Sequence, residues 1–382
     1  MTRSLRILYV GAFLAILVGL GLWSLSGLAG FQRSAQMTLL DGHFTQAVQT
    51  RYDEQFPIKR LGTNLWAAVE YLLFNEGRPG VVLGRDHWLY SDEEFNPVAD
   101  GQRYAAENFA LIRGVRDTLA QHHVQLVLAI VPAKARLYPE HIGQQPPAAL
   151  HAQLYQQFHA RAQQAGILAP ELLAPLQQAK ADGAVFLRTD THWTPLGAEV
   201  VARQLSQAIA AHDPLAGAPQ TYVTDSQAAA PYKGDLTTFL PLDPLFGNLL
   251  PPPDDLAQRS THLQQAAEAS ADALFASDDI AVALVGTSYS ANPHWNFLGA
   301  LQQALHSDVI NYAENGHGPI LPMLKYLQGE AFKNSPPQVL IWEFPERYLP
   351  MKNDFSEFDP KWIAELKRPS AGNQDLALGQ ND

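Results

Sequence analysis

Three observations predict an α/β fold with a mainly parallel sheet. The run from Val124 to Val131 is continuously apolar and ends at Pro132, which is typical of a strand buried on both faces. Thr194 and Pro195 open a long stretch with helical apolar spacing, as an N-cap and a first helical residue do. Short apolar runs alternate with such stretches along the chain, which favours parallel strands covered by helices on both faces.

Each expected strand is a short apolar run. These runs are 81–83, 124–131, 185–187, 280–285, 308–312 and 339–342. The expected helices have apolar residues at helical spacing, and the second of the stretches below is two helices broken at Pro170. The stretches are 101–121, 147–181, 195–211 and 296–306.

An uncharged apolar stretch, residues 7–30, follows Arg3 and Arg6 near the N-terminus. It is long enough for a bilayer-spanning helix, which takes about 20 residues, and it is longer than the apolar region of a signal peptide. Because both arginines precede the stretch, the positive-inside rule places residues 1–6 in the cytoplasm. We therefore expect a membrane anchor followed by an exported protein. A signal peptide cleaved near residues 28–30 is the alternative.

The exported part is expected to comprise a stalk, one catalytic domain and a tail. Residues 31–78 are mixed in character and predict a helical or irregular stalk. Residues 79–350 carry the strand–helix alternation. Within them, about 213–278 is rich in Pro, Ala, Gln and Asp and is expected to be an insertion that runs over the surface. Residues 351–382 are polar and predict a loosely attached tail.

Composition excludes several classes of function. The chain has 382 residues and a formal net charge of −12, which argues against non-specific binding of nucleic acid. It contains no cysteine, so disulfides, thiol catalysis, iron–sulfur clusters and cysteine-bound zinc are absent. An exported protein without a phosphate-binding glycine-rich loop is also not expected to use ATP or pyridine nucleotides.

Two polar clusters follow expected strands, where ligands bind in open parallel sheets. Residues 188–193 read Arg-Thr-Asp-Thr-His-Trp, and residues 286–290 read Gly-Thr-Ser-Tyr-Ser. A serine hydroxyl is a weak nucleophile at neutral pH unless an imidazole takes its proton, and a carboxylate can orient that imidazole. The clusters therefore supply the residue types of a nucleophile, a base and an orienting acid.

Less specific interpretations of the same clusters remain open at this point. Asp190 can cap a turn, His192 can be a structural histidine, and the serine-containing loop can be an ordinary strand-to-helix connection. The loop lacks the Gly-x-Ser-x-Gly pattern of α/β-hydrolases. A metal site is the sharper alternative, with candidate ligands Asp190, His192 and His294, which Asp86 and His87 could join, although no established metal motif is present.

Taken together, Thr-Asp-Thr-His-Trp-Thr at 189–194 and Gly-Thr-Ser-Tyr-Ser at 286–290 resemble the SGNH-hydrolase-like polysaccharide O-acetyltransferases of the AlgJ/AlgX family. Further matches are residues 84–90, 131–134 and 342–347. The N-terminal anchor and residues 52–57 are most similar to the AlgJ members. The resemblance runs from the first residue to about residue 350, and it implies an SGNH-type α/β sandwich.

The resemblance implies a role for each matching residue. Ser288 would carry the acetyl group, His192 would be its base, and Asp190 would orient His192. For the oxyanion hole the resemblance leaves several candidates. They are the backbone N–H of Tyr289, the loop that contains Asn315 and Gly316, and Asn296.

The implied reaction is acetylation of the mannuronate residues of alginate, at O2, O3 or both, in the periplasm, with the anchor in the inner membrane. The implied partners are the membrane O-acyltransferase AlgI, the periplasmic protein AlgF and the alginate polymerisation and export complex. No cofactor or metal is expected. Alginate is a polyanion and the chain is acidic, so local basic residues are needed. Candidate substrate-binding residues are Arg188, Lys134, Arg347 and Tyr289. A periplasmic acetylesterase and a non-catalytic alginate-binding scaffold are the alternative functions.

Overall fold

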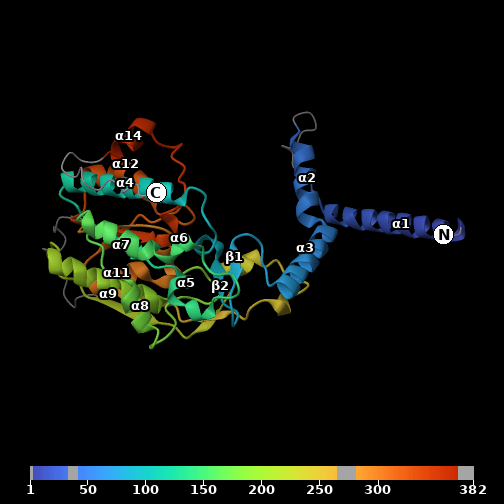
Figure 1. The fold of residues 1–382 in the computed structure, drawn as a ribbon, viewed down its shortest axis with the longest axis horizontal. Coiled ribbons are helices and arrows are strands. Elements are labelled where there is room, and N and C mark those ends of the chain that lie inside the picture. Colours follow the sequence, from blue (N-terminus) through green and yellow to red (C-terminus); the bar gives the residue numbers. More distant parts are fainter. Residues whose placement is uncertain (1–2, 33–41, 265–280, 369–382) are drawn as a thin grey trace. The chain divides into compact units, whose positions relative to one another are not determined.

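The computed structural model describes residues 3–32, 42–264 and 281–368, and the chain divides into two compact units. Unit 1 comprises Met1–Pro79 and Thr238–Leu250, and unit 2 comprises Gly80–Thr237 and Pro251–Asp382 (Figure 1). Unit 2 has the α/β architecture that the sequence predicts.

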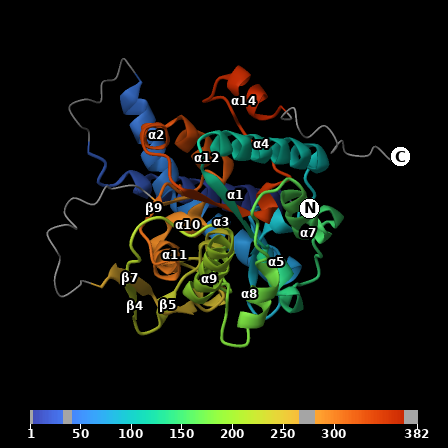
Figure 2. The ribbon, with the colours of Figure 1, turned by 90° about the vertical axis from the view of Figure 1, so that its left-hand side faces the viewer.

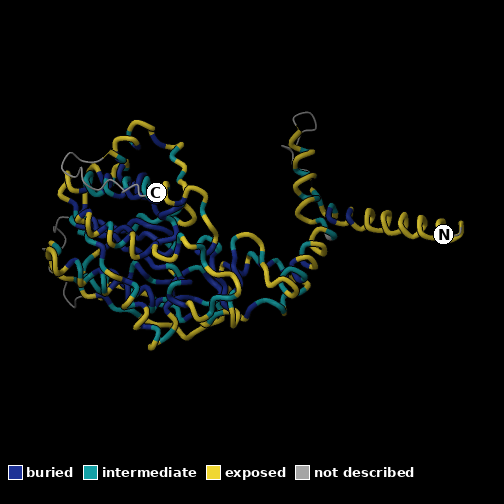
Figure 3. Tube along the Cα trace, in the orientation of Figure 1, coloured by how far each residue is buried: buried dark blue, intermediate teal, exposed yellow. Residues whose placement is uncertain are grey.

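Unit 1 is helical. It contains α1 (Arg3–Ser24), the 3-10 turn η1 (Leu25–Leu28), α2 (His43–Gln55), α3 (Pro57–Val69) and the π-helical turn η2 (Glu70–Phe74). The stretch Arg3–Leu28 is long and apolar enough to cross a membrane. An N-terminal signal sequence can meet the same criterion, so this finding does not distinguish an anchor from a signal sequence. Figure 3 shows α1 exposed along nearly its whole length.

The central sheet of unit 2 has four parallel strands in the order β3-β10-β8-β9. Their bounds are Gln125–Val131 for β3, Val339–Pro345 for β10, Val282–Val285 for β8 and Val309–Asn311 for β9. Strand β10 pairs on both sides, so that Trp342 lies between Leu128 and Val285. All seven residues of β10 are buried, which explains why its sequence is a continuous apolar run apart from Glu343.

Helices cover both faces of this sheet (Figures 1 and 2). One face packs on α4 (Gly101–Gln121), α7 (Leu154–Gln164), α12 (Ile320–Gln328) and α14 (Pro360–Leu366). The other face packs on α8 (Leu173–Ala179), α9 (Pro195–His212) and α11 (Phe297–Leu305). Alternate strand residues enter the two cores: Val127 and Ile341 lie on the α9 side, and Leu128 and Trp342 lie on the α4 side.

Shorter elements surround this sandwich. Three two-stranded antiparallel ribbons are formed by β1 (Val81–Leu83) with β2 (Leu89–Ser91), β4 (Tyr222–Ser226) with β7 (Arg259–Leu263), and β5 (Ala230–Tyr232) with β6 (Asp254–Leu256). The short helices are α5 (Lys134–Leu137), α6 (Ala149–Ala152), α10 (Ser288–Ala291) and α13 (Glu330–Asn334).

The stretch 185–187, expected to be a strand, is part of a closed loop instead. The N–H of Leu187 donates to the carbonyl of His192, and the N–H of Thr194 donates to the carbonyl of Val185. A single antiparallel bridge joins Phe186 to Trp193. Because these backbone groups pair with one another, the stretch does not join the sheet, and the loop folds back toward its own start.

The structure also differs from the expected organisation in three places. Residues 147–181 form three helices, because α6 precedes α7 and α8. The stretch 213–278 is not one excursion, since residues 238–250 belong to unit 1 and the β4–β7 and β5–β6 ribbons belong to unit 2; residues 265–280 lie outside the described residues. The expected tail packs on unit 2 as far as Leu366, whose main chain approaches Gly114 so closely that a Cβ there would have no room.

Candidate active site

Ser288 lies at the carboxyl end of β8, as the first residue of α10. Gly286 and Thr287 make the turn between the two elements, and the Thr287 hydroxyl accepts a hydrogen bond from the N–H of Tyr289 at 3.3 Å. The turn needs glycine at 286, because a Cβ there would lie 2.5 Å from Oε2 of Glu343. Ser288 is half-buried and so is reachable from solvent.

The loop at 188–193 brings Asp190 and His192 to this serine. Nε2 of His192 lies 2.6 Å from Oγ of Ser288, and Nδ1 lies 2.7 Å from Oδ1 of Asp190. With the proton on Nδ1, the imidazole donates to the carboxylate and accepts from the serine hydroxyl. The structure therefore brings the three predicted residues together in the hydrogen-bond order of a Ser–His–Asp triad.

Asp190 is fully buried, and both of its oxygens accept hydrogen bonds. Oδ1 also accepts from the N–H of His192 at 2.9 Å, and Oδ2 accepts from the N–H of Asp235 at 2.8 Å and from the Tyr232 hydroxyl at 3.3 Å. Burial alone would raise the pKa of Asp190, but the hydrogen bonds and the charge of His192 hold that pKa below its ordinary value. The carboxylate is thus kept ionised beside the imidazole.

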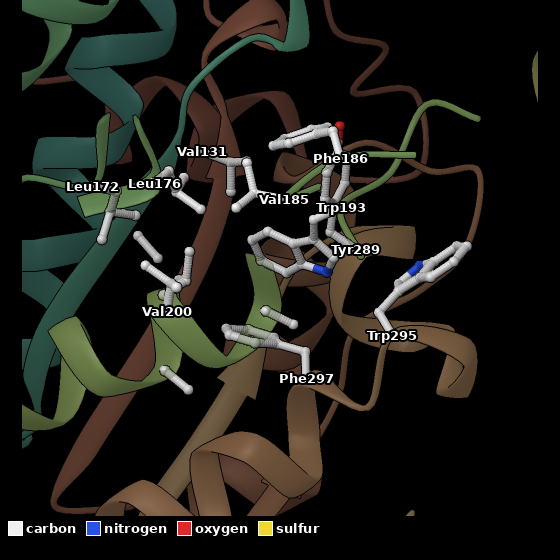
Figure 4. Packing of buried hydrophobic residues seen from close by; sticks show 14 of the residues in the cluster. Val131, Leu172, Leu176, Val185, Phe186, Trp193, Val200, Tyr289, Trp295 and Phe297 are labelled. Atoms are coloured by element: carbon white, nitrogen blue, oxygen red, sulfur yellow. The ribbon is translucent and has the colours of Figure 1, made fainter. Parts of the chain in front are cut away.

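Aromatic rings fix the plane of His192. Its imidazole stacks on Trp295 with a centroid distance of 5.1 Å and an interplanar angle of 20°, and the ring of Tyr289 lies at 4.7 Å. Tyr289 in turn packs edge-on against Trp193 at 5.0 Å, and Trp193 packs against Phe297 at 4.7 Å. Figure 4 shows Trp193, Tyr289 and Phe297 within the core on which the site rests.

Two acidic residues that the sequence analysis did not single out hold the 188–192 loop. The Asp254 carboxylate accepts from the N–H groups of Arg188 and Thr189, both at 2.9 Å, and from the Thr189 hydroxyl at 2.5 Å. Asp235 Oδ1 accepts from the N–H of Thr191 at 2.8 Å, and Asp235 Oδ2 lies 3.8 Å from Nδ1 of His192. Desolvation and the neighbouring charge of Asp190 raise the pKa of Asp235. Both residues come from the stretch that was expected to be a surface insertion.

Glu343 holds the residues on either side of Ser288 and Tyr289 through its buried carboxylate. It lies on β10 and is fully buried, and its carboxylate accepts from the Thr287 N–H at 2.7 Å, the Thr287 hydroxyl at 2.9 Å and the Ser290 hydroxyl at 3.1 Å. Burial raises the pKa of Glu343, although these hydrogen bonds oppose the rise. The residues on both sides of the Ser288–Tyr289 pair are therefore tied to one strand of the central sheet.

Lys134, expected to bind substrate, lies in the interior instead, with 1% of its surface exposed. Its ammonium donates to the carbonyls of Leu89 at 2.6 Å and of Arg188 and Asp190 at 2.9 Å each. Burial lowers the pKa of Lys134 to about 8. Because the three protons of its ammonium are donated to main-chain carbonyls, Lys134 cannot present a charge to a ligand. It supports the loop that contains Asp190 from the interior.

Arg347 and the Tyr289 side chain, also expected to bind substrate, are interior residues too. Arg347 is 4% exposed; its Nε donates to Glu93 at 2.8 Å and its Nη1 to the Tyr289 hydroxyl at 3.1 Å. That hydroxyl donates to the carbonyl of Thr191 at 2.7 Å. The chain of contacts links the loop that carries His192 to the end of β10, so these side chains hold the site together and are not at its surface.

The remaining predicted residues are closer to solvent. The Arg188 guanidinium donates to the carbonyls of Pro252 at 2.6 Å and Pro253 at 3.2 Å and stays partly exposed. Asn315 and Gly316 lie in an exposed turn whose start is near the nucleophile loop, because the N–H of Glu314 donates to the carbonyl of Gly286 at 3.2 Å. The side-chain amide of Asn296 donates to the Thr261 hydroxyl at 2.8 Å.

The structure also bears on the metal-site alternative. Within residues 3–32, 42–264 and 281–368, the acidic and histidine ligands that converge are those of Asp190, His192 and Asp235, whose atoms lie within 4.8 Å of one another. His294 instead contacts Asn292 at 2.6 Å, and Asp86 contacts His141 at 3.1 Å. Because both ring nitrogens of His192 are engaged with Asp190 and Ser288, the arrangement favours proton transfer over metal binding.

Comparison with known proteins assigns the fold to a family. The family model described as "SGNH hydrolase-like domain, acetyltransferase AlgX" matches residues 81–346. The protein named probable alginate O-acetylase AlgJ of Pseudomonas syringae pv. tomato is 67% identical over 378 residues, which cover 99% of this chain and 97% of that protein. The protein of the same name from Pseudomonas aeruginosa is 54% identical over 387 residues, which cover 100% of this chain and 99% of that protein.

Two solved structures resemble the fold. The O-acetyltransferase domain of Pseudomonas putida AlgJ superposes with a TM-score of 0.70 at 66% identity, covering 76% of this chain and 99% of that domain. Pseudomonas aeruginosa AlgX gives a TM-score of 0.53 at 25% identity, covering 71% of this chain and 66% of that protein.

Proposed function

The chain belongs to the AlgX family of SGNH hydrolase-like acetyltransferases and is a polysaccharide O-acetyltransferase; on that premise we propose that it acetylates mannuronate residues of alginate, at O2, O3 or both, through an acetyl-Ser288 intermediate. The observation that carries the proposal is the 2.6 Å contact between Nε2 of His192 and Oγ of Ser288. The proteins named probable alginate O-acetylase AlgJ, which match nearly the whole chain, support alginate as the polymer.

In the first step the Ser288 hydroxyl attacks the carbonyl carbon of an acetyl donor. His192 Nε2 takes the hydroxyl proton, and Asp190 stabilises the imidazolium through Nδ1. The bond between the acetyl carbon and the leaving group then breaks, and the leaving group departs with the proton from His192. The backbone N–H of Tyr289 and the Asn315–Gly316 turn are our candidates for donors to the oxyanion, and the long bond from Tyr289 to Thr287 is one that a developing charge can replace.

In the second step a mannuronate hydroxyl attacks the acetyl carbon of acetyl-Ser288. His192 removes the hydroxyl proton and returns it to Oγ of Ser288 as the serine ester bond breaks, so the enzyme is regenerated. Water in place of the sugar would release acetate, which is the reaction of an esterase. Arg188 is a basic residue near the triad that remains partly exposed, and we propose that it pairs with a uronate carboxylate.

We further propose that α1 is retained as an inner-membrane anchor, with the catalytic unit in the periplasm. An anchor raises the effective concentration of the enzyme near a membrane-borne donor. The donor would be supplied by the membrane O-acyltransferase AlgI. AlgF and the alginate polymerisation and export complex would be the other partners. The reaction as written needs no cofactor or metal from this chain.

The test is to treat the purified chain with a chromogenic acetyl ester and map the adduct by mass spectrometry. We expect acetyl on Ser288 in the wild type, none in Ser288→Ala and little in His192→Ala. Ser206→Ala is the matched control, since Ser206 lies on α9 and donates to the Ala304 carbonyl away from the triad. Adding mannuronate oligomers should move the acetyl group to the sugar. Release of acetate at an unchanged rate would favour the esterase, and a Ser288→Ala strain that still acetylates alginate would favour the scaffold.

A further inference from the structure

Unit 1 exposes large apolar side chains on α3 and on the turn that follows it. We call this set the stalk face, and its side chains are between 41% and 73% exposed. Its members are Leu61, Leu65, Trp66, Leu72, Leu73 and Phe74. Isolated exposed leucines are common on soluble proteins, but six large apolar residues within 14 positions form a patch of the kind that marks an interaction site.

The stalk face is outward because the inward side of α3 is lined by small and polar residues. Ala67 and Ala68 are buried, and Asn64 is buried with its amide donating to the carbonyl of Pro241 at 2.5 Å. Leu61 and Leu65 are one helical turn apart on the other side. This is the reverse of the arrangement in a water-soluble helix, where the large apolar residues face the core.

The stalk face also lies beside the end of the membrane-type helix. The Tyr52 hydroxyl of α2 donates to the Ser24 hydroxyl at the end of α1 at 3.0 Å. Gly27 in η1 packs so closely on the Gln55 carbonyl that a Cβ would not fit. Helix α3 follows Gln55 after a single residue and contacts α1 itself. Figure 1 shows α3 beginning beside the end of α1 and turning away from its direction. The start of α3 therefore lies at the level where a spanning α1 leaves the bilayer.

We propose that the stalk face is embedded in the headgroup–acyl boundary of the bilayer that α1 spans. A lipid occupant fits because leucine, phenylalanine and tryptophan side chains are those that interfacial helices bury to a depth of about 5–10 Å. Lys59 and Arg60 are exposed at the start of α3 and can pair with anionic headgroups. The chain would then hold the membrane at two adjoining places, by α1 and by the stalk face. This inference rests on the proposed retention of α1 as an anchor.

The chain has no cysteine, so single-cysteine variants allow a direct test. We would label Leu65→Cys and Leu73→Cys with a nitroxide in the full-length chain, reconstituted alone into vesicles of phosphatidylethanolamine and phosphatidylglycerol. Collision with lipid-soluble oxygen is then compared with collision with a water-soluble nickel complex. Leu14→Cys in the middle of α1 gives the value for a label in the bilayer, and Gln207→Cys, exposed on α9, gives the value in water.

We expect the oxygen-to-nickel ratio at Leu65 and Leu73 to exceed that at Gln207 several-fold and to stay below that at Leu14. A ratio at both positions equal to that at Gln207, with Leu14 in the bilayer, overturns the inference and leaves the anchor intact. A low ratio at Leu14 instead shows that the proposed anchor fails. Reduced collision with both reagents at Leu65 and Leu73 would mean that a second copy of the chain covers the stalk face, which also overturns a lipid occupant.

Discussion

Replacing Lys134 by Met tests whether its buried ammonium holds the catalytic loop in position. The substitution keeps an unbranched side chain of similar length and removes the charge and all three donors. The carbonyls of Leu89, Arg188 and Asp190 would lose their shared partner. Two of these carbonyls belong to the loop that carries the Asp190–His192 pair, so the loss reaches the triad through the main chain.

These contacts allow an estimate of how far Lys134→Met lowers the free energy of unfolding. Each hydrogen bond to a charged group is worth about 1.5–3 kcal/mol net, and the burial that lowers the pKa of Lys134 to about 8 offsets part of that sum. The Glu94 carboxylate, which accepts from the N–H of Lys134 at 3.1 Å, would also lose its cationic neighbour. Removing one partner from such a buried set typically costs about 3–5 kcal/mol. We expect Lys134→Met to lower the free energy of unfolding by about 3 kcal/mol.

Activity should fall as well, because a shift of about 1 Å in a catalytic group can reduce the rate about 100-fold. The assays are urea unfolding and the rate of acetyl-Ser288 formation from a chromogenic ester. Lys180→Met is the matched control. Lys180 also bonds a main-chain carbonyl, that of Leu137 at 2.7 Å, but this is one such bond instead of three and its pair with Glu140 is solvent-exposed, so a smaller loss of about 1–2 kcal/mol is expected.

A Lys134→Met variant as stable and as active as Lys180→Met would refute the positioning role of Lys134. That result would mean that the Asp190 loop keeps its geometry through Asp254 and Asp235 alone. A variant that is destabilised as expected yet acetylates Ser288 at the wild-type rate would also contradict a positioning role, because it would show that Lys134 serves only the stability of the fold.

Three further substitutions test other parts of the site. Glu343→Gln replaces a carboxylate that accepts from three groups, the N–H and hydroxyl of Thr287 and the hydroxyl of Ser290, by a neutral amide. The free energy of unfolding should fall by about 1–3 kcal/mol, and acetylation of Ser288 in a single turnover should slow. Asp235→Asn weakens the acceptor of the Thr191 N–H at 2.8 Å and removes a carboxylate oxygen 3.8 Å from Nδ1 of His192, so the 188–192 loop is held less firmly and acetylation of Ser288 by the chromogenic ester should slow. Burial raises the pKa of Glu346 to about 7, so the folded state holds its proton at a pH where the unfolded state has lost it. Stability should therefore fall by up to about 3 kcal/mol as pH rises from the unfolded value to about 7, and urea unfolding of Glu346→Gln should lack this decline.

Features with a local signal were predictable from the sequence. The apolar run at 124–131 becomes β3, and the Thr194–Pro195 pair begins α9, where the Thr194 hydroxyl accepts from the N–H of Gly197 at 3.2 Å. The proximity of Asp190, His192 and Ser288 was also predictable, because both clusters follow apolar runs and match a family pattern. Within each cluster the residues that carry the pattern lie within a few positions of one another, although His192 and Ser288 are 96 positions apart.

Features that depend on distant partners were not predictable. Asp254 and Asp235 reach the catalytic loop across 65 and 44 positions, and nothing in their own surroundings in the sequence marks them for that loop. Residues 185–187 have the composition of a strand, but hydrogen bonds within the loop use the backbone groups that a sheet would need. The composition around a residue does not indicate which backbone group, distant in the sequence, will form a hydrogen bond with it in the fold.

The positive charge of a residue also did not predict whether it lies at the surface or in the interior. Lys134 and Arg347 were expected to bind a polyanion because they are cationic and lie near strand ends. Both are buried instead, and their charged groups contact atoms of the protein interior. Ionic groups withdrawn from water contribute little net stability, since desolvation offsets their attraction, but they tolerate few alternative geometries. Lys134 fixes the carbonyl of Asp190, Glu343 fixes the turn before Ser288, and Arg347 fixes the tyrosine that holds Thr191. Because these charges are used to position the triad, the attraction of an acidic chain for an acidic polymer must come from other basic groups, those left at the surface, with Arg188 the nearest of them in sequence to Asp190.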